Sequence, residues 1–178
     1  DSDNAYKNSS LSAGVKIEKL GAVSGVEYSN GTLKWAAVEK ADKYDISING
    51  TAVVEGLTSP SYSYDLKGGE KIVVSVKSND ETIYSSSAEF TVLNCPVVSF
   101  DGEFVSWTGG ALYNVAITDS AGAEKVCINE KTDIKTEISA LGKGVYTVSV
   151  QAVGSGSNIS SPESVVKFAV GYDVTIDK

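Results

Sequence analysis

An internal repeat constrains the fold of this chain more than any other feature of its sequence. The copies lie 72 residues apart at Trp35 and Trp107 and 69 apart at Tyr44 and Tyr113, so the spacing changes only between candidate strands. Loops gain and lose residues while strands keep their register, so the pattern predicts two copies of one small domain. The matching segments are GTLKWAAVEKADKYDISI (31–48) with GEFVSWTGGALYNVAI (102–117), and LKGGEKIVVSVKS (66–78) with LGKGVYTVSVQA (141–152).

Within each copy the apolar residues alternate with polar ones. A period of two predicts half-buried strands, and Asn-Gly or Asp-Gly pairs at 30–31, 49–50 and 101–102 supply the turns between them. No segment has a convincing helical stripe. We therefore expect an all-β chain of two tandem antiparallel β-sandwich domains. The alternating sets are Leu33/Trp35, Tyr44/Ile46/Ile48 and Ile72/Val74/Val76 in the first copy, and Val105/Trp107, Tyr113/Val115/Ile117 and Tyr146/Val148/Val150 in the second.

Both copies resemble the fibronectin type III module, particularly the short bacterial version found in secreted and surface-attached proteins. The resemblance covers about residues 20–170 and lies in the tryptophans Trp35 and Trp107, the tyrosines Tyr44 and Tyr113, and the Leu141, Gly144, Tyr146 series of the second copy. In that family the tryptophan packs between the sheets and the last tyrosine makes a corner hydrogen bond. The first copy has Ile72 in place of that tyrosine, which puts its corner bond in doubt.

The resemblance also divides the chain. We expect a polar N-terminal segment or linker at 1–18, a first fibronectin type III-like domain at 19–93, a second at 95–170, and a linker or the start of a further module at 171–178. A link of two or three residues is short, so the two domains should form a semi-rigid rod.

The conspicuous aromatic residues are expected in the interior rather than in a binding surface. Burying one tryptophan removes roughly 150–250 Å² from water, which is a large part of what stabilises a domain of this size. The predicted structural core contains Trp35, Trp107, Tyr44, Tyr113 and Tyr146.

One loop, SNDETIYSSS (78–87), contains the only ligand-binding candidates, Tyr84 and Asp80. For Tyr84 we favour packing against the domain junction or a strand edge. The acidic residues Asp42, Asp45, Asp80 and Glu81 could contribute to a calcium site, but they lack EF-hand or nonapeptide spacing. Solvated loop charge is the favoured interpretation, and neither a metal nor a cofactor is predicted.

Missing residue types exclude several functions. The chain has no histidine and no arginine, so all 15 basic residues are lysines, and its net charge is −8. Without histidine, Ser-His-Asp or Cys-His activation and ordinary zinc sites are removed. A strongly negative chain without arginine is a poor partner for nucleic acids and anionic membrane surfaces. No apolar run is long enough to span a bilayer.

The two cysteines leave two alternatives open. Cys95 and Cys127 lack the C-x-x-C spacing of redox or zinc sites. As a disulfide they would close a loop of about 33 residues, worth about 3–4 kcal/mol in the chain-entropy model. As free thiols they would be small buried apolar side chains. We favour free thiols, because on the predicted fold the two residues belong to different sheets and must face each other to be bridged.

These observations favour a non-catalytic structural or spacer module, or an interaction module, of an exported cell-surface protein. The alternative is an adhesion module that binds carbohydrate or protein through its strand-connecting loops. A carboxylate-dependent glycoside hydrolase is a distant third, because a narrow sandwich offers little cavity. The expected partner, if there is one, is a glycan or protein at the cell surface, and the expected state is a monomer. The polar start, DSDNAYKNSS, is compatible with export and anchoring to lipid or wall through other segments.

Overall fold

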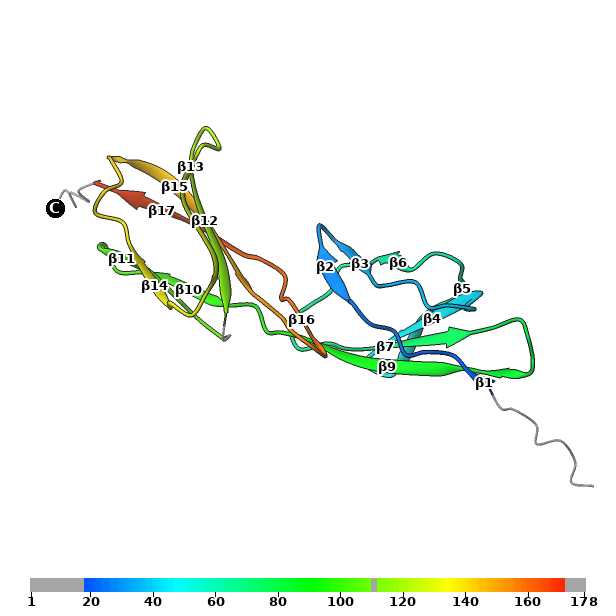
Figure 1. Cartoon of the computed structure of the whole chain (residues 1–178). Helices are drawn as coiled ribbons and strands as arrows, with labels where there is room; N and C mark the ends of the chain where they lie inside the picture. Colours follow the sequence, from blue (N-terminus) through cyan, green and yellow to red (C-terminus); the bar gives the residue numbers. More distant parts are fainter. Residues whose placement is uncertain (1–17, 110–111, 172–178) are drawn as a thin grey trace, which may run out of the picture.

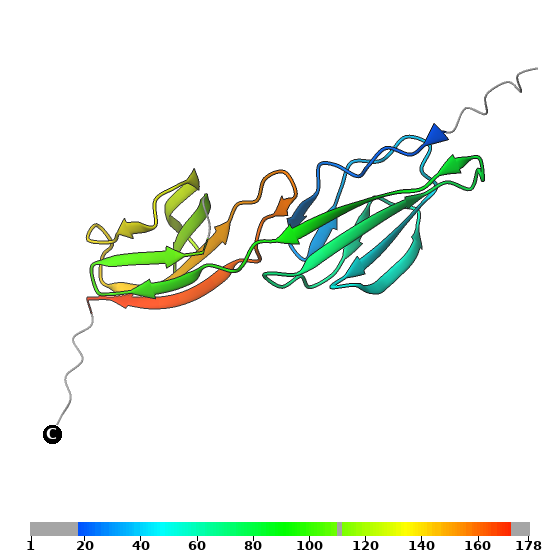
Figure 2. The same ribbon diagram turned by 90° about the horizontal axis from the view of Figure 1, so that it is seen from below.

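The structure is a computed structural model that describes residues 18–109 and 112–171, and these residues form strands and no helix. Figures 1 and 2 show two β-sandwiches placed end to end. We call them module 1 (β1 to β9) and module 2 (β10 to β17). The prediction of an all-β chain with two tandem antiparallel sandwiches is confirmed.

Module 1 packs a three-stranded sheet, β2-β3-β6, against a sheet in which β9, β7, β4 and β5 are neighbours. Asn30-Gly31 and Asn49-Gly50 form two-residue turns with positive φ at all four residues, as the predicted hairpins require. Its strands are β1 (Glu18–Lys19), β2 (Glu27–Ser29), β3 (Thr32–Lys34), β4 (Lys43–Ile48), β5 (Thr51–Leu57), β6 (Ser61–Ser63), β7 (Lys71–Lys77), β8 (Ile83–Tyr84) and β9 (Ser86–Val92).

Module 2 repeats this arrangement with the sheets β10-β11-β14 and β13-β12-β15-β17. The equivalent central pairs, β4 with β7 and β12 with β15, are both antiparallel. Its strands are β10 (Val97–Phe100), β11 (Phe104–Thr108), β12 (Tyr113–Asp119), β13 (Glu124–Lys131), β14 (Lys135–Glu137), β15 (Gly144–Ala152), β16 (Asn158–Ile159) and β17 (Ser164–Val170).

Each module has its own hydrophobic core. The core of module 1 comes from residues between Leu20 and Val92, with one addition, Ile159, from the sequence of module 2. The core of module 2 comes from residues between Val105 and Phe168. The packing of the two cores thus crosses the predicted boundary near residue 94 at one residue, Ile159.

The two modules fix their corner turns with different tyrosines. In module 2 the hydroxyl of Tyr146 donates to the carbonyl oxygen of Gly142 at 2.9 Å. Module 1 has isoleucine at that position, and Tyr28 on β2 takes over. Its hydroxyl donates to the carbonyl oxygen of Tyr64 at 3.2 Å and accepts from the buried N–H of Leu66 at 3.2 Å. Tyr146 lies on β15 of the four-stranded sheet, whereas Tyr28 lies on β2 of the three-stranded sheet. The equivalent corner of module 1 is thus hydrogen-bonded from the opposite sheet.

Three expectations need correction or lie outside the described residues. Cys95 and Cys127 are free thiols, but both are exposed rather than buried. Glu18, assigned to the polar N-terminal segment, is the first residue of β1. The rest of that segment, and residues 172–178 of the predicted C-terminal linker, are not among the residues that the structure describes.

Candidate functional site: the junction between the modules

The link between the modules, residues 93–96, is held tightly against module 1. The N–H of Gly69 donates to the carbonyl oxygen of Val92 at 2.9 Å. A Cβ atom placed on Gly68 would lie 2.7 Å from the backbone nitrogen of Cys95. Real Cβ atoms do not approach backbone this closely, so the path of the link requires glycine at position 68.

A strand of module 2 also joins the sheet of module 1. The short strand β16 pairs with β9 in parallel, which places it at the edge of the sheet β16-β9-β7-β4-β5. The N–H of Thr91 donates to Ser157 at 2.9 Å, and the N–H of Leu93 donates to Ile159 at 2.9 Å, both through carbonyl oxygens. Ile159 is 1% exposed and belongs to the core of module 1. Figure 1 shows β16 lying between the two sandwiches, beside β9.

The loop that carries β16 is braced from within. A Cβ atom on Gly154 would lie 2.3 Å from the carbonyl oxygen of Asn158, so the loop closes on itself only with glycine there. The N–H of Gly154 donates to the hydroxyl of Ser160 at 3.0 Å. The hydroxyl of Ser161, fully buried, accepts from the N–H of Ala152 at 3.0 Å. These contacts within the loop hold Ile159 in the position at which it packs against module 1.

An open groove of about 820 Å³ runs beside this junction. On the module 2 side, Glu130 has a positive φ of 50° and donates its N–H to the side-chain oxygen of Asn114 at 3.0 Å. A non-glycine residue in this region is a strained feature that can redirect a side chain. The polar side chains in the lining include Glu27, Glu89, Asn114, Glu130 and Asn158.

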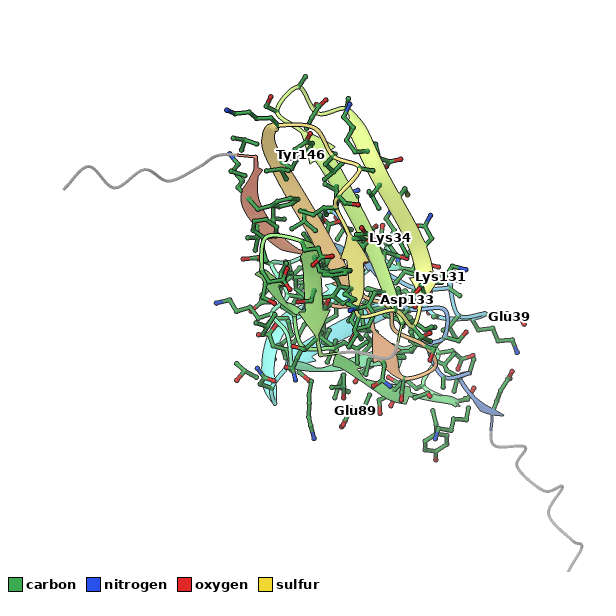
Figure 3. The ribbon with its side chains drawn as sticks, turned by 90° about the vertical axis from the view of Figure 1, so that its left-hand side faces the viewer. Lys34, Glu39, Glu89, Lys131, Asp133 and Tyr146 are labelled. Atoms are coloured by element: carbon green, nitrogen blue, oxygen red, sulfur yellow. The ribbon has the colours of Figure 1, made fainter. Side chains whose placement is uncertain are left out.

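The acidic side chains labelled in Figure 3, which are Glu39, Glu89 and Asp133, lie apart from one another. Over residues 18–109 and 112–171, no group of three or more Cys, Asp or Glu side chains is arranged to hold a metal ion. The same residues include no helix that would span a bilayer.

Two of the acidic residues considered as calcium ligands, Asp42 and Asp45, bond to other parts of module 1. Asp42 accepts from the N–H of Asn79 at 2.7 Å. Partial burial raises the pKa of Asp45, but the ion pair with Lys77 and the N–H of Gly56 outweigh burial, so the pKa lies below its usual value. Asp42 thus joins two loops, and Asp45 on β4 joins its strand to β5 and β7.

The two ligand-binding candidates occupy the far end of module 1. Asp80 accepts from the hydroxyl and the N–H of Thr82 at 2.7 and 2.9 Å, and these bonds lower the pKa of its carboxyl group. Asp80 therefore forms the turn that leads into β8. Tyr84 is 59% exposed, and its strand β8 pairs with β1. They stand on one loop, away from the junction.

The aromatic residues predicted as core lie in the two interiors. Trp35 packs edge-on against Tyr44 with ring centroids 5.3 Å apart, and Trp107 packs edge-on against Tyr113 at 6.0 Å. Both indole Nε1 atoms are buried with no hydrogen-bond partner among the described residues. Rings enclosed in this way cannot form a sugar-binding platform. Their exposed fractions are 5% for Trp35, 3% for Tyr44, 1% for Trp107, 2% for Tyr113 and 7% for Tyr146.

Sequence reasoning missed the role of Ile159. The segment GSGSNISS (154–161) has the composition of a flexible turn, and strand propensity assigns it nothing. A signal was present, because Ile159-Ser160-Ser161 corresponds to Tyr84-Ser85-Ser86 in the first copy. An alignment of these two loops indicates that each has a large side chain at the equivalent position of the repeat.

Comparison with solved structures finds similar folds. A two-domain fibronectin type III segment of chicken tenascin shares 19% identity, covering 83% of this chain and 99% of that one, with a TM-score of 0.37. The ligand-binding domain of human OSCAR shares 13% identity, covering 85% and 100%, with a TM-score of 0.36. The fibronectin(III)-like modules of Clostridium thermocellum CbhA share 14% identity, covering 83% and 90%, with a TM-score of 0.30.

Likenesses at this level say nothing about function. The sheets described above, three strands packed against four in each module, make the fold of both modules fibronectin type III-like. No protein-family model matches the sequence, and no curated protein matches it.

Proposed function

We propose that this chain is a non-catalytic spacer of an exported cell-surface protein, in which two modules form one stiff unit that holds other parts of the protein apart. The observation that supports this most strongly is the junction. Module 2 adds β16 to the sheet of module 1 and places Ile159 in its core. A link without such contacts would let the modules move independently, which is the default for domains with small interfaces.

The glycines of the junction support the same role. Gly68 lets the link lie against module 1, and Gly154 lets the β16 loop fold tightly enough to reach β9. Both contacts restrict bending, because the link is held from two sides. The chain thus uses residues from both modules to make a connection that chain length alone would leave partly flexible.

Residual dipolar couplings and small-angle scattering test the stiffness. In the wild-type chain both modules should fit one alignment tensor, and the scattering should give a single extended shape. Gly154→Val should displace β16 and give each module its own tensor. Gly142→Val is the matched control, because a side chain there meets nothing within 4 Å. Independent tumbling of the modules in the wild-type chain would contradict a spacer role.

Binding of carbohydrate or protein is the second candidate, and the groove beside the junction favours it. Its polar lining and the strained Glu130 are features that a recognition surface could use. A glycan array and a pull-down with the full chain test this function. Binding that is lost in Asn114→Ala and kept in Lys43→Ala, which is outside the groove lining and pairs with Lys77, would establish the groove as a site. If no probe binds, the binding function is rejected and the spacer role is the one that remains.

A further inference from the structure

The outer end of module 1 reproduces the junction between the modules. There β1 pairs in parallel with β8, just as the end of β9 pairs in parallel with β16. The partners are Glu18 with Ile83 and Lys19 with Tyr84 at the outer end, and Thr91 with Asn158 and Val92 with Ile159 at the junction. Both β8 and β16 lie in the loop before the last strand of their module.

Two backbone hydrogen bonds at the outer end have counterparts at the junction. The N–H of Leu20 donates to Tyr84 at 3.0 Å, and the N–H of Leu93 donates to Ile159 at 2.9 Å. The turns that lead into the two strands also match, since Ile83 donates to Asp80 at 3.0 Å and Asn158 donates to Ser155 at 3.0 Å. All four bonds end on carbonyl oxygens. β1 therefore stands where the end of a preceding module's last strand stands at the junction.

The side chains that follow β1 and β9 also take equivalent places. Leu20 is 5% exposed in the core of module 1, and Leu93 packs against the core of module 2. In both cases the leucine enters the core of the module that follows it. The equivalence therefore includes packing as well as backbone pairing.

One side chain differs between the two places, and the difference suggests an absent partner. Ile159 is 1% exposed because module 1 covers it, whereas its counterpart Tyr84 is 59% exposed. A single exposed apolar side chain is common on protein surfaces, but Tyr84 occupies the position at which Ile159 contacts a neighbouring module. Tyrosine is among the residues most often found at the centre of protein interfaces.

From these observations we propose that the β1–β8 end of module 1 is a docking surface for another β-sandwich module of this fold, joined in line so that its last strand runs into β1. The incoming module would cover Tyr84 as module 1 covers Ile159. This inference deepens the spacer role and rests on it, because it extends the same stiff connection to a further module.

A fusion of the chain with itself tests the proposal. In this fusion the first copy, residues 18–168, is followed directly by the second copy, residues 18–170. Glu18 of the second copy then follows Phe168 of the first copy, as Thr91 follows Phe90 at the natural junction. Tyr84→Ala is then made in one copy at a time. In the second copy, which has a module ahead of it, the substitution should lower the melting temperature of that preceding module by several degrees, because Tyr84 would lie against it as Ile159 lies against module 1. In the first copy, with no module ahead, the change should be clearly smaller, because exposed substitutions alter stability little.

The orientation of the modules gives an independent readout. Dipolar couplings across the new middle junction should fit one tensor with the module on each side, and a Gly/Ser linker of about six residues inserted before Glu18 should abolish this. Equal effects of Tyr84→Ala in both copies, or a middle junction as free as the linker variant, would overturn the docking surface. The two natural junctions in the same fusion report on the spacer role separately, so its failure would be distinguished.

Discussion

The two modules share one architecture but differ in what completes their cores. Module 2 builds its core from its own strands and the adjoining link residue Leu93. Module 1 takes Ile159 from a loop of its neighbour. The difference means that Ile159 couples the two modules, and the coupling free energy is the same in both directions, because each module is more stable when the other is folded. The repeat makes the modules look interchangeable, but the junction does not.

Removing each tryptophan should show this coupling most strongly. Trp35→Ala and Trp107→Ala each delete a buried indole and should cost their own module about 3–5 kcal/mol. Because each variant keeps the other tryptophan, its fluorescence reports the other module. Where Trp107→Ala unfolds module 2, module 1 should lose the contact of Ile159, and where Trp35→Ala unfolds module 1, module 2 should lose the same coupling free energy. A module whose stability does not change when the other unfolds would contradict the coupling.

Ile159→Ala tests the contact itself and should have the next largest effect. The substitution leaves a cavity in module 1 and should lower its stability by about 2–4 kcal/mol, although the residue belongs to the sequence of module 2. Denaturant unfolding in Trp107→Phe and Trp35→Phe backgrounds separates the two modules. Asn158→Ala, at the exposed neighbouring position of β16, is the control and should change either module little. A loss of stability confined to module 2 would contradict the assignment of Ile159 to the core of module 1.

The two tyrosine corners should differ by a smaller amount. Tyr146→Phe removes one hydrogen bond and should cost module 2 about 1 kcal/mol. Tyr28→Phe removes two, although the N–H of Leu66 keeps the carbonyl oxygen of Tyr64 at 3.1 Å as an acceptor, so we expect a cost to module 1 of about 1–2 kcal/mol. Thermal unfolding of each variant checks the order, which would be reversed if Tyr28 served only as a packing group.

The smallest expected effect is a pH dependence of the turns. Module 2 uses Asp101 and Asp119 at two hairpin turns where module 1 uses Asn30 and Asn49. N–H groups of Phe104 and Glu103 lower the pKa of Asp101, and Lys125 with the N–H of Ala123 lowers that of Asp119. A carboxyl group with a lowered folded pKa contributes stability that is complete above its unfolded pKa, about 3.9, and is lost as pH falls through the folded value.

Acid should therefore weaken these two turns and leave the asparagine turns of module 1 unaffected. In a Trp35→Phe background, the melting temperature of module 2 should fall as pH is lowered from 5 to about 2.5. Asp101→Asn with Asp119→Asn should reduce that fall. The reduction is small because both carboxylates are exposed to solvent. A fall that is unchanged in the double variant would assign the acid sensitivity to other carboxylates.

Much of the fold was predictable because it is written in local pattern. The alternation of Tyr44, Ile46 and Ile48 predicts a half-buried strand, and the Asn-Gly pairs predict their turns from backbone conformation alone. The enclosure of Trp35 and Trp107 followed from their recurrence at equivalent positions. By contrast, the exposure of Cys95 and Cys127 depended on which side of a link or edge strand each faces, which composition does not specify.

By itself, the sequence determined that this chain is a tandem of two β-sandwiches, because period-two patterning and turn residues act over a few neighbouring positions. Only the tertiary structure decided that Ile159 stabilises the other module and that Tyr84 stands at the matching place uncovered. Strand addition depends on where two loops lie relative to distant strand edges, and such long-range pairing leaves no period in the sequence. The close approaches at Gly68 and Gly154 are likewise set by the whole fold, since a glycine in a loop shows its need for space only when its neighbours are in place.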